Sequence, residues 1–262
     1  MGFLRGLGKF FGSLVFTTFL ALGIVLMGII AITSHDSIKQ TASDILEKQL
    51  LSANMDTTLQ DVRAFLLFQC TQSSKTTLTL SGNLPQVILD CNDVRNSDSS
   101  KLPSLIAGSI VDSVYYRTFG CDFTNLLQCS QSPSNTLQGA PIFFLSNEAN
   151  QLYRTAMTYA WILSAVGLLI LLVSIETLPG RFQGVGWNLV ITSLPILVLN
   201  KVQSFIPAGS QEAADAVKPL IDNFISSTTK LFMIALVIGI ICLIVGYGIK
   251  FYQSKKQNKR KR

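Results

Sequence analysis

The chain has 262 residues, of which 48% are hydrophobic and only 14% charged, and its formal net charge is +6. Soluble domains carry roughly 25% charged residues, so this composition excludes an ordinary water-soluble globular protein. The positive excess comes from the two ends of the chain, because residues 34–153 hold 7 basic and 11 acidic residues, a net of −4. This distribution argues against a basic domain that grips nucleic acid.

The chain begins with a short tail, 1–9, that carries Arg5 and Lys9 and no acidic residue. No formal charge follows until Asp36, and we predict a transmembrane helix over 10–33. At a rise of about 1.5 Å per residue this stretch is long enough to cross the hydrocarbon core, which is about 30 Å thick. A cleaved signal peptide is the alternative, but its apolar core would be only about 7 to 15 residues long. We therefore expect an uncleaved anchor.

Residues 34–153 form the largest segment between predicted spans and are interpreted as an extracytoplasmic domain. From His35 to Gln69 no Pro or Gly occurs, and apolar residues recur mostly every three or four positions. This spacing predicts a helical stalk that continues the first span, with a break near Asn54.

The middle of this segment is rich in β-forming residues. The runs KTTLTL and QVILDC are separated by SGNLP, which predicts a hairpin with Gly82 and Asn83 in its turn. Pro103 stands at the start of a second amphipathic helix, where its missing N–H would be unpaired in any case. Residues 130–141 are expected to be a polar loop, and the chain becomes helical again near Ser146. We thus predict an α+β fold here.

Four of the five cysteines lie in the extracytoplasmic segment: Cys70, Cys91, Cys121 and Cys129. An even number of cysteines outside the cytoplasm predicts disulfides, with three possible connectivities. We favour Cys70 with Cys91, which bracket the hairpin, and Cys121 with Cys129. Zinc is the alternative, but the chain has no CxxC pair and its lone histidine is distant in sequence. We expect no metal and no cofactor.

Three further spans are predicted, at 154–176, 183–203 and 230–250, each centred on a charge-free run of at least 19 residues. The third contains a polar patch of Asn188, Thr192 and Ser193, together with Pro195. Such groups more often hold helices together than line a pore. Between the last two spans, 204–229 is predicted to be an extracytoplasmic amphipathic loop.

The orientation follows from the positive residues, which favour the cytoplasmic side. Both termini and the short loop 177–182 are therefore predicted to be cytoplasmic, in a multi-pass protein of the cell membrane. The C-terminal tail, 251–262, carries a basic cluster that we interpret as an anchor touching lipid headgroups: Lys255, Lys256, Lys259, Arg260, Lys261 and Arg262.

No catalytic constellation is visible in the sequence. His35, the only histidine, lies where the first span ends, and we expect it to be solvated. Asp36 follows it directly, but adjacent side chains on a helix do not face each other. We therefore predict a non-enzymatic protein.

The hairpin end LDCNDVRNS and the following LIAGSIVDSVYYRTFGCDF with its further cysteine are similar to sequences in multi-pass membrane proteins of archaea whose activity is uncharacterised. The likeness covers roughly residues 70–129 and the spans. It implies membrane helices joined to a cysteine-containing extracytoplasmic domain and carries no activity with it.

The predicted fold is thus a mainly α membrane protein. Four transmembrane helices carry an α+β, disulfide-stapled extracytoplasmic domain between spans one and two. The predicted function is a cell-envelope interaction, scaffold or complex subunit. Its partners would be membrane lipids and a protein partner or second copy reached through the extracytoplasmic domain, and no nucleic acid. The alternative is an oligomeric channel or transporter with the polar patch of the third span on its pore.

Overall fold

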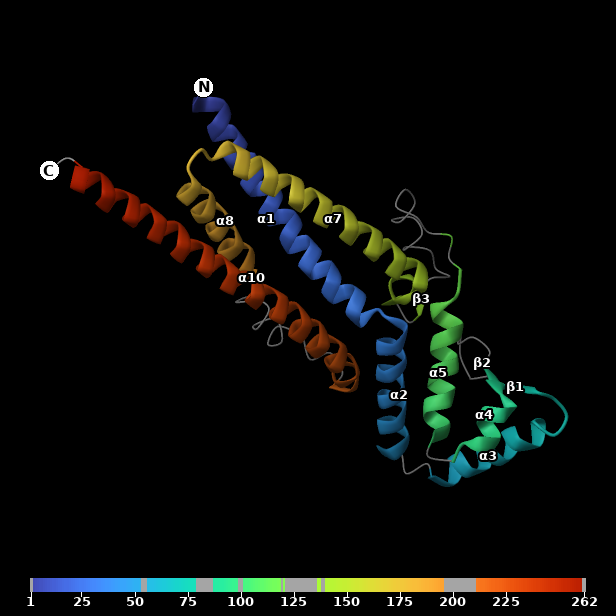
Figure 1. Ribbon diagram of the computed structural model, residues 1–262. Helices are drawn as coiled ribbons and strands as arrows, with labels where there is room; N and C mark the ends of the chain where they lie inside the picture. The colour runs from blue at the N-terminus through green and yellow to red at the C-terminus, as the bar shows by residue number, and fades with distance from the viewer. Residues whose placement is uncertain are drawn as a thin grey trace. The chain divides into compact units, whose positions relative to one another are not determined.

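The computed structural model describes residues 2–52, 56–78, 87–98, 101–118, 120, 136–137, 140–195 and 211–260. These residues are mainly helical (Figure 1). They divide into two compact units, which are described separately. The first unit, called the bundle, comprises Met1–Ile29 and Tyr153–Arg262, and the second, called the outer domain, comprises Ile30–Leu152.

The bundle is built from four helices: α1 (Gly2–Ile32), α7 (Asn147–Ser174), α8 (Leu178–Ser193) and α10 (Gln211–Arg260). In the described part of the chain, three helical segments are long and apolar enough to cross a membrane: Arg5–Ile32, Asn147–Ser174 and Ile221–Lys256. They cover the predicted first, second and fourth spans. A helix suits these apolar segments in lipid because it pairs its backbone hydrogen-bonding groups internally.

The predicted third span is not confirmed as a span. Its described part is α8, a helix of 16 residues, which is about 24 Å long at the usual rise and falls short of the hydrocarbon core. Residues 196–203 lie outside the described chain. By contrast, the described part of the predicted loop 204–229, residues 211–229, is helical and continuous with the fourth span, because α10 runs without interruption over 50 residues.

Glycines let the bundle helices approach closely. A Cβ added to Gly167 of α7 would lie 2.6 Å from the backbone nitrogen of Phe16, and one added to Gly12 of α1 would lie 2.8 Å from that of Leu171. On the other side, a Cβ at Gly186 of α8 would lie 2.8 Å from the carbonyl oxygen of Gly239 in α10. Larger residues would not fit at these crossings. Small residues are what membrane helices use to pack, since lipid supplies no hydrophobic drive between them.

An apolar cluster fills the bundle between α1, α8 and α10. Its buried members are Phe16, Leu20, Ile24, Leu189, Phe232 and Ala235. Most large side chains on the other faces of α7 and α10 are exposed, for example Val173 and Ile244. The bundle therefore has a narrow packed interior and broad apolar outer faces.

The outer domain begins with two helices, α2 (His35–Ser52) and α3 (Asp56–Gln69). A hairpin follows, in which β1 (Lys75–Leu78) pairs antiparallel with β2 (Val87–Asp90), with Thr76 opposite Leu89. Then come α4 (Cys91–Asn96) and α5 (Leu102–Tyr115), with a proline in the first turn of α5. The predicted hairpin and second helix are confirmed, whereas the turn residues Gly82 and Asn83 lie outside the described chain.

The remaining outer elements are short. Strands β3 (Thr136–Leu137) and β4 (Ala140–Pro141) pair antiparallel, and a 3-10 turn, η3, covers Ile142–Leu145. The prediction of a purely polar loop over 130–141 was therefore wrong in its second half. The Ser146 hydroxyl then accepts a hydrogen bond from the backbone N–H of Ala149 at 3.2 Å, which caps the start of α7.

The predicted stalk is interrupted where the first helix ends. Helix α1 ends at Ile32 and α2 begins at His35, so Thr33 and Ser34 separate two helices that were expected to be one. Asn150 holds this junction. Its amide nitrogen donates to the carbonyl of Thr33 at 3.2 Å and to the Thr33 hydroxyl at 3.0 Å, with the carbonyl of Ile30 at 3.4 Å. The carbonyl of Ile30, in the last turn of α1, is thereby paired.

Candidate functional site

A disulfide joins the end of α3 to the start of α4. Cys70 and Cys91 are bonded with an S–S length of 2.02 Å and a Cα–Cα distance of 5.4 Å. This pair confirms the predicted pairing around the hairpin. The other predicted cysteines, Cys121 and Cys129, lie outside the described residues.

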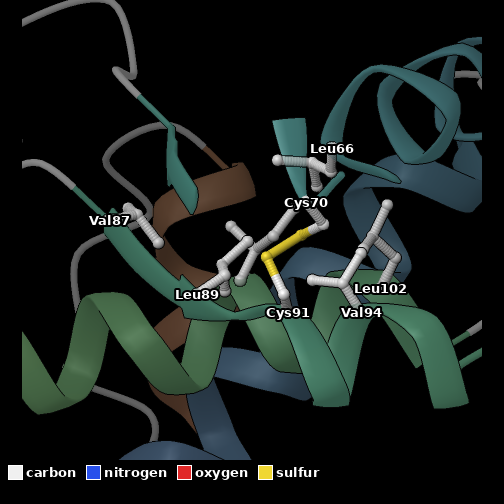
Figure 2. Close-up of a cluster of buried hydrophobic side chains, with 8 residues drawn as sticks. Leu66, Cys70, Val87, Leu89, Cys91, Val94 and Leu102 are labelled. Carbon is white, nitrogen blue, oxygen red and sulfur yellow. A yellow bond between two sulfur atoms is a disulfide. The ribbon is translucent and has the colours of Figure 1, made fainter. Parts of the chain in front are cut away.

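The disulfide is part of the small core of the outer domain (Figure 2). The side chains around it come from α3, β2, α4 and α5: Leu66, Val87, Leu89, Val94, Leu102 and Ile106. Arg95 adds a polar link, since its guanidinium donates to the Cys70 carbonyl at 2.5 Å. The bond therefore clamps the hairpin to α3 at the centre of the packing, and both sulfurs are shielded from solvent.

The opposite side of α3 is exposed and aromatic. Leu66 and Cys70 face the core, while Phe65 and Phe68 are 53% and 68% exposed. Residues three apart on a helix are neighbours, so the two rings form one patch, called the Phe65–Phe68 surface. Asp61 and Gln72 beside it are exposed as well. Larger apolar patches with a polar rim are typical of interaction sites.

His35 is not solvated as predicted but tied to α5. Its Nε2 lies 2.5 Å from Oδ1 of Asp112, and its Nδ1 lies 3.4 Å from Oδ1 of Asp36. The imidazole ring also contacts the rings of Tyr115 and Tyr116, at centroid distances of 5.2 and 5.4 Å. The prediction failed because the partner lies 77 residues away in the chain, and no local pattern reveals such a contact.

Lys39, one turn after His35, strengthens this link. Its Nζ lies 3.9 Å from Oδ2 of Asp112. Its Cε would be 2.6 Å from a Cβ placed on Gly108, so the lysine crosses α5 closely at this glycine. The described neighbours of His35 are thus the carboxylates of Asp36 and Asp112 and the rings of Tyr115 and Tyr116. The cluster is a fastening between α2 and α5.

The polar patch predicted in the third span lies inside the bundle. Asn188, Thr192 and Ser193 are all buried on α8. The Asn188 amide donates to the Gly184 carbonyl at 2.7 Å, and the two hydroxyls donate to carbonyls one turn back, both at 2.8 Å. Ser13 of α1 donates to the Asn188 side-chain oxygen. These bonds satisfy the polar groups within the helix packing.

The predicted basic cluster is partly visible. Lys255 and Lys256 are exposed near the end of α10, the helix continues through Lys259 and Arg260, and Lys261 and Arg262 lie outside the described residues. At the same end of the bundle, Arg5 forms an ion pair with Glu176. Within the described chain, no group of three or more His, Cys, Asp or Glu residues is arranged to hold a metal ion.

Comparison with known proteins finds no matching family model, no similar curated protein and no similar solved structure. The similarity to archaeal membrane proteins therefore stays a prediction, and the functional argument depends on this chain alone.

Two features of these sites were missed from the sequence. The sequence does not single out Phe65, although Val62, Leu66 and Cys70 form a stripe at four-residue steps that excludes it from the buried face. If the predicted disulfide places Cys70 in the core, this stripe is the buried face of the helix. The exposure of Phe65 could therefore have been predicted from the sequence. The His35 link to Asp112 had no such signal.

Proposed function

We propose that this chain is a non-enzymatic integral membrane protein that presents its outer domain to a protein partner, as a scaffold or complex subunit of the cell envelope. In this proposal four helices cross the membrane, both termini are cytoplasmic, and residues 34–153 are extracytoplasmic. The observation that carries the proposal is the Phe65–Phe68 surface on a domain clamped by a disulfide.

The membrane placement is supported by the outer faces of the bundle. Large apolar side chains such as Ile162, Val173 and Ile244 are exposed on α7 and α10. In water, exposure costs about 25 cal/mol for each Å² of apolar surface, whereas lipid removes this cost. Three helices of sufficient length support the same placement.

The third span is proposed from the way α8 packs. It lies along α10 (Figure 1) through Gly186 and Gly239, and a Cβ on Gly246 would lie 3.0 Å from the Pro179 carbonyl. A helix held at backbone distance along a spanning helix is expected to run with it through the lipid. An even number of spans then brings the basic N-terminal and C-terminal ends to the same side, as the positive-inside rule requires.

The interaction role is proposed from the contrast between the buried face and the exposed face of α3. The core of the outer domain is small, yet two of the largest apolar side chains of this helix are outside it. Aromatic residues are enriched at protein–protein contacts because a rigid ring buries much area at low entropic cost. A partner that covers the Phe65–Phe68 surface would remove both rings from water.

The test is photo-crosslinking in native membranes from position 72, where the exposed Gln72 lies beside the Phe65–Phe68 surface, followed by purification of the adduct. We expect a defined protein adduct that disappears in the Phe65→Ser/Phe68→Ser variant. The matched control is Ile88→Ser, which removes an exposed apolar side chain from the hairpin of the same domain and should leave the adduct unchanged. Failure to form any adduct while the Cys70–Cys91 bond is intact would contradict the proposal.

The channel or transporter alternative needs Asn188, Thr192 and Ser193 to meet water. Their burial and their hydrogen bonds to nearby carbonyls support a packing role instead. Flux measurements on liposomes containing the pure protein discriminate the two. Flux that falls in Asn188→Leu would favour the channel over the scaffold.

A further inference from the structure

We propose that the C-terminal end of α10 binds the headgroups of anionic phospholipids. The inference assumes the membrane placement proposed above but does not depend on the protein partner. It concerns the exposed surface formed by Ile244, Gly248, Tyr252, Lys255 and Lys256, called the α10 lipid surface.

The first argument is charge. The two ends of α10 differ in charge. The beginning carries both acidic and basic residues: Glu212, Asp215, Lys218, Asp222 and Lys230. After Lys230 every charged residue of the helix is basic: Lys250, Lys255, Lys256, Lys259 and Arg260. Other described cations at the same end of the bundle are exposed too, namely Lys9 and Arg181, and the one described acid there, Glu176, is paired with Arg5. Among the described residues, the result is a positive surface whose one carboxylate, Glu176, is paired.

The second argument is the shape of the helix face. Ile244, Gly248, Tyr252 and Lys256 follow one another at four-residue steps and therefore lie in one row. Ile244 and Tyr252 are exposed, and a Cβ placed on Gly248 would meet no atom within 4 Å. The missing side chain leaves a recess between two large apolar groups. An acyl chain fits along this row, with its phosphate beside Lys255 and Lys256.

The third argument is the order of chemistries along the row. Apolar residues give way to an aromatic and then to lysines, which is the order that a lipid presents from its chains to its headgroup. Tyr247 and Phe251 flank the row and are also exposed. Aromatic rings favour the level of the headgroups, and nearby basic residues are attracted to anionic lipid. A nucleic acid would use the lysines but would leave this apolar part unused, so we favour lipid.

The experiment is native mass spectrometry of the full chain in detergent, titrated with phosphatidylglycerol or phosphatidylcholine of identical chains. We expect phosphatidylglycerol to bind more tightly. The variant Lys255→Gln/Lys256→Gln should lose about tenfold or more in phosphatidylglycerol affinity, given the attraction per basic residue near an anionic surface. Its matched control, Lys218→Gln/Lys230→Gln, changes the net charge equally at the other end of the same helix and should bind as the wild type does.

A second pair of variants tests the recess separately from the charge. Gly248→Leu should weaken both lipids several-fold and keep their ratio, whereas Gly6→Leu, at another glycine with open space around it, should weaken neither. Equal loss in both lysine variants would reduce the effect to bulk charge and overturn the proposal. So would equal binding of the two lipids, or displacement of phosphatidylglycerol by a single-stranded oligonucleotide of similar concentration. None of these outcomes bears on the Phe65–Phe68 surface.

Discussion

The bundle and the outer domain are each stabilised in a different way. In the bundle, helices touch through glycines, and the added Cβ distances of 2.6 to 2.8 Å leave no space for a side chain at the α1–α7 and α8–α10 crossings. In the outer domain, short elements surround a covalent bond between Cys70 and Cys91. Away from this bond, polar contacts such as that of His35 with Asp112 connect the helices of the domain.

The difference follows from the two solvents. Lipid tails are as apolar as leucine, so membrane helices gain little by hiding apolar area and depend on close backbone contact. The outer domain is proposed to face water, where burial does stabilise, but its elements are too short to bury much. A small domain of this kind needs a staple. Close contacts at glycines therefore stabilise the bundle, and a disulfide stabilises the outer domain.

The largest expected effect breaks the staple of the outer domain. Cys70→Ser/Cys91→Ser opens a loop with a sequence separation of 21 and should lower the free energy of unfolding by about 3 kcal/mol. Limited trypsin digestion of proteoliposomes should cut the outer domain faster. Both tryptophans, Trp161 and Trp187, are in the bundle, so their fluorescence should not change. Cys242→Ser is the control, and equal digestion of both variants would contradict the clamp.

The next effect breaks the bundle instead. Gly167→Leu places a side chain against the backbone of Phe16 and should cost about 2 kcal/mol through overpacking. Unfolding in increasing sodium dodecyl sulfate, followed by tryptophan fluorescence, measures this. Gly248→Leu adds the same side chain where there is room and should unfold as the wild type does. Indistinguishable curves for the two leucine variants would show that the α1–α7 crossing is not close.

A smaller effect concerns the fastening between α2 and α5. The His35 and Asp112 side chains are 24% and 46% exposed, so their coupling should be under about 1 kcal/mol, as for other partly exposed pairs. A double-mutant cycle with His35→Gln and Asp112→Asn, read by hydrogen exchange of α5, measures it. Asp36→Asn should leave exchange unchanged. A coupling of zero would mean that packing alone holds these helices.

The smallest effect is expected inside the bundle, at Asn188. Asn188→Leu removes the bond from Ser13 and should cost about 0.6 kcal/mol, the average for polar contacts between membrane helices. The same fluorescence assay applies, with Thr158→Val on an exposed part of α7 as the control. A loss of several kcal/mol would show that polar contacts, rather than glycines, hold the bundle together.

The sequence predicted the features that depend on residues close together in the chain. Charge-free runs located three candidate membrane helices, because a spanning segment must be apolar throughout. The hairpin and its disulfide followed from alternating β-forming residues between Cys70 and Cys91. The third span stays a prediction, since α8 ends at Ser193 and the chain is described only as far as Pro195.

The contacts that decide how these elements pack were not predictable. Ser13 and Asn188 are separated by 175 residues, and nothing in either segment indicates the other. The break at Thr33 and Ser34 also has no breaker residue, because it depends on Asn150 pairing with the carbonyls there. Periodicity gives the faces of a helix, but which face is covered depends on a partner that only the fold supplies.

The uninterrupted course of α10 has a mechanical consequence. From Leu220, after its single proline, to Arg260 the helix is about 60 Å long, roughly twice the thickness of the hydrocarbon core. A rod of this length acts as a lever: a tilt of about 10° around its midpoint would carry each tip about 5 Å sideways. A force that moves one tip of the helix would therefore also move the other tip.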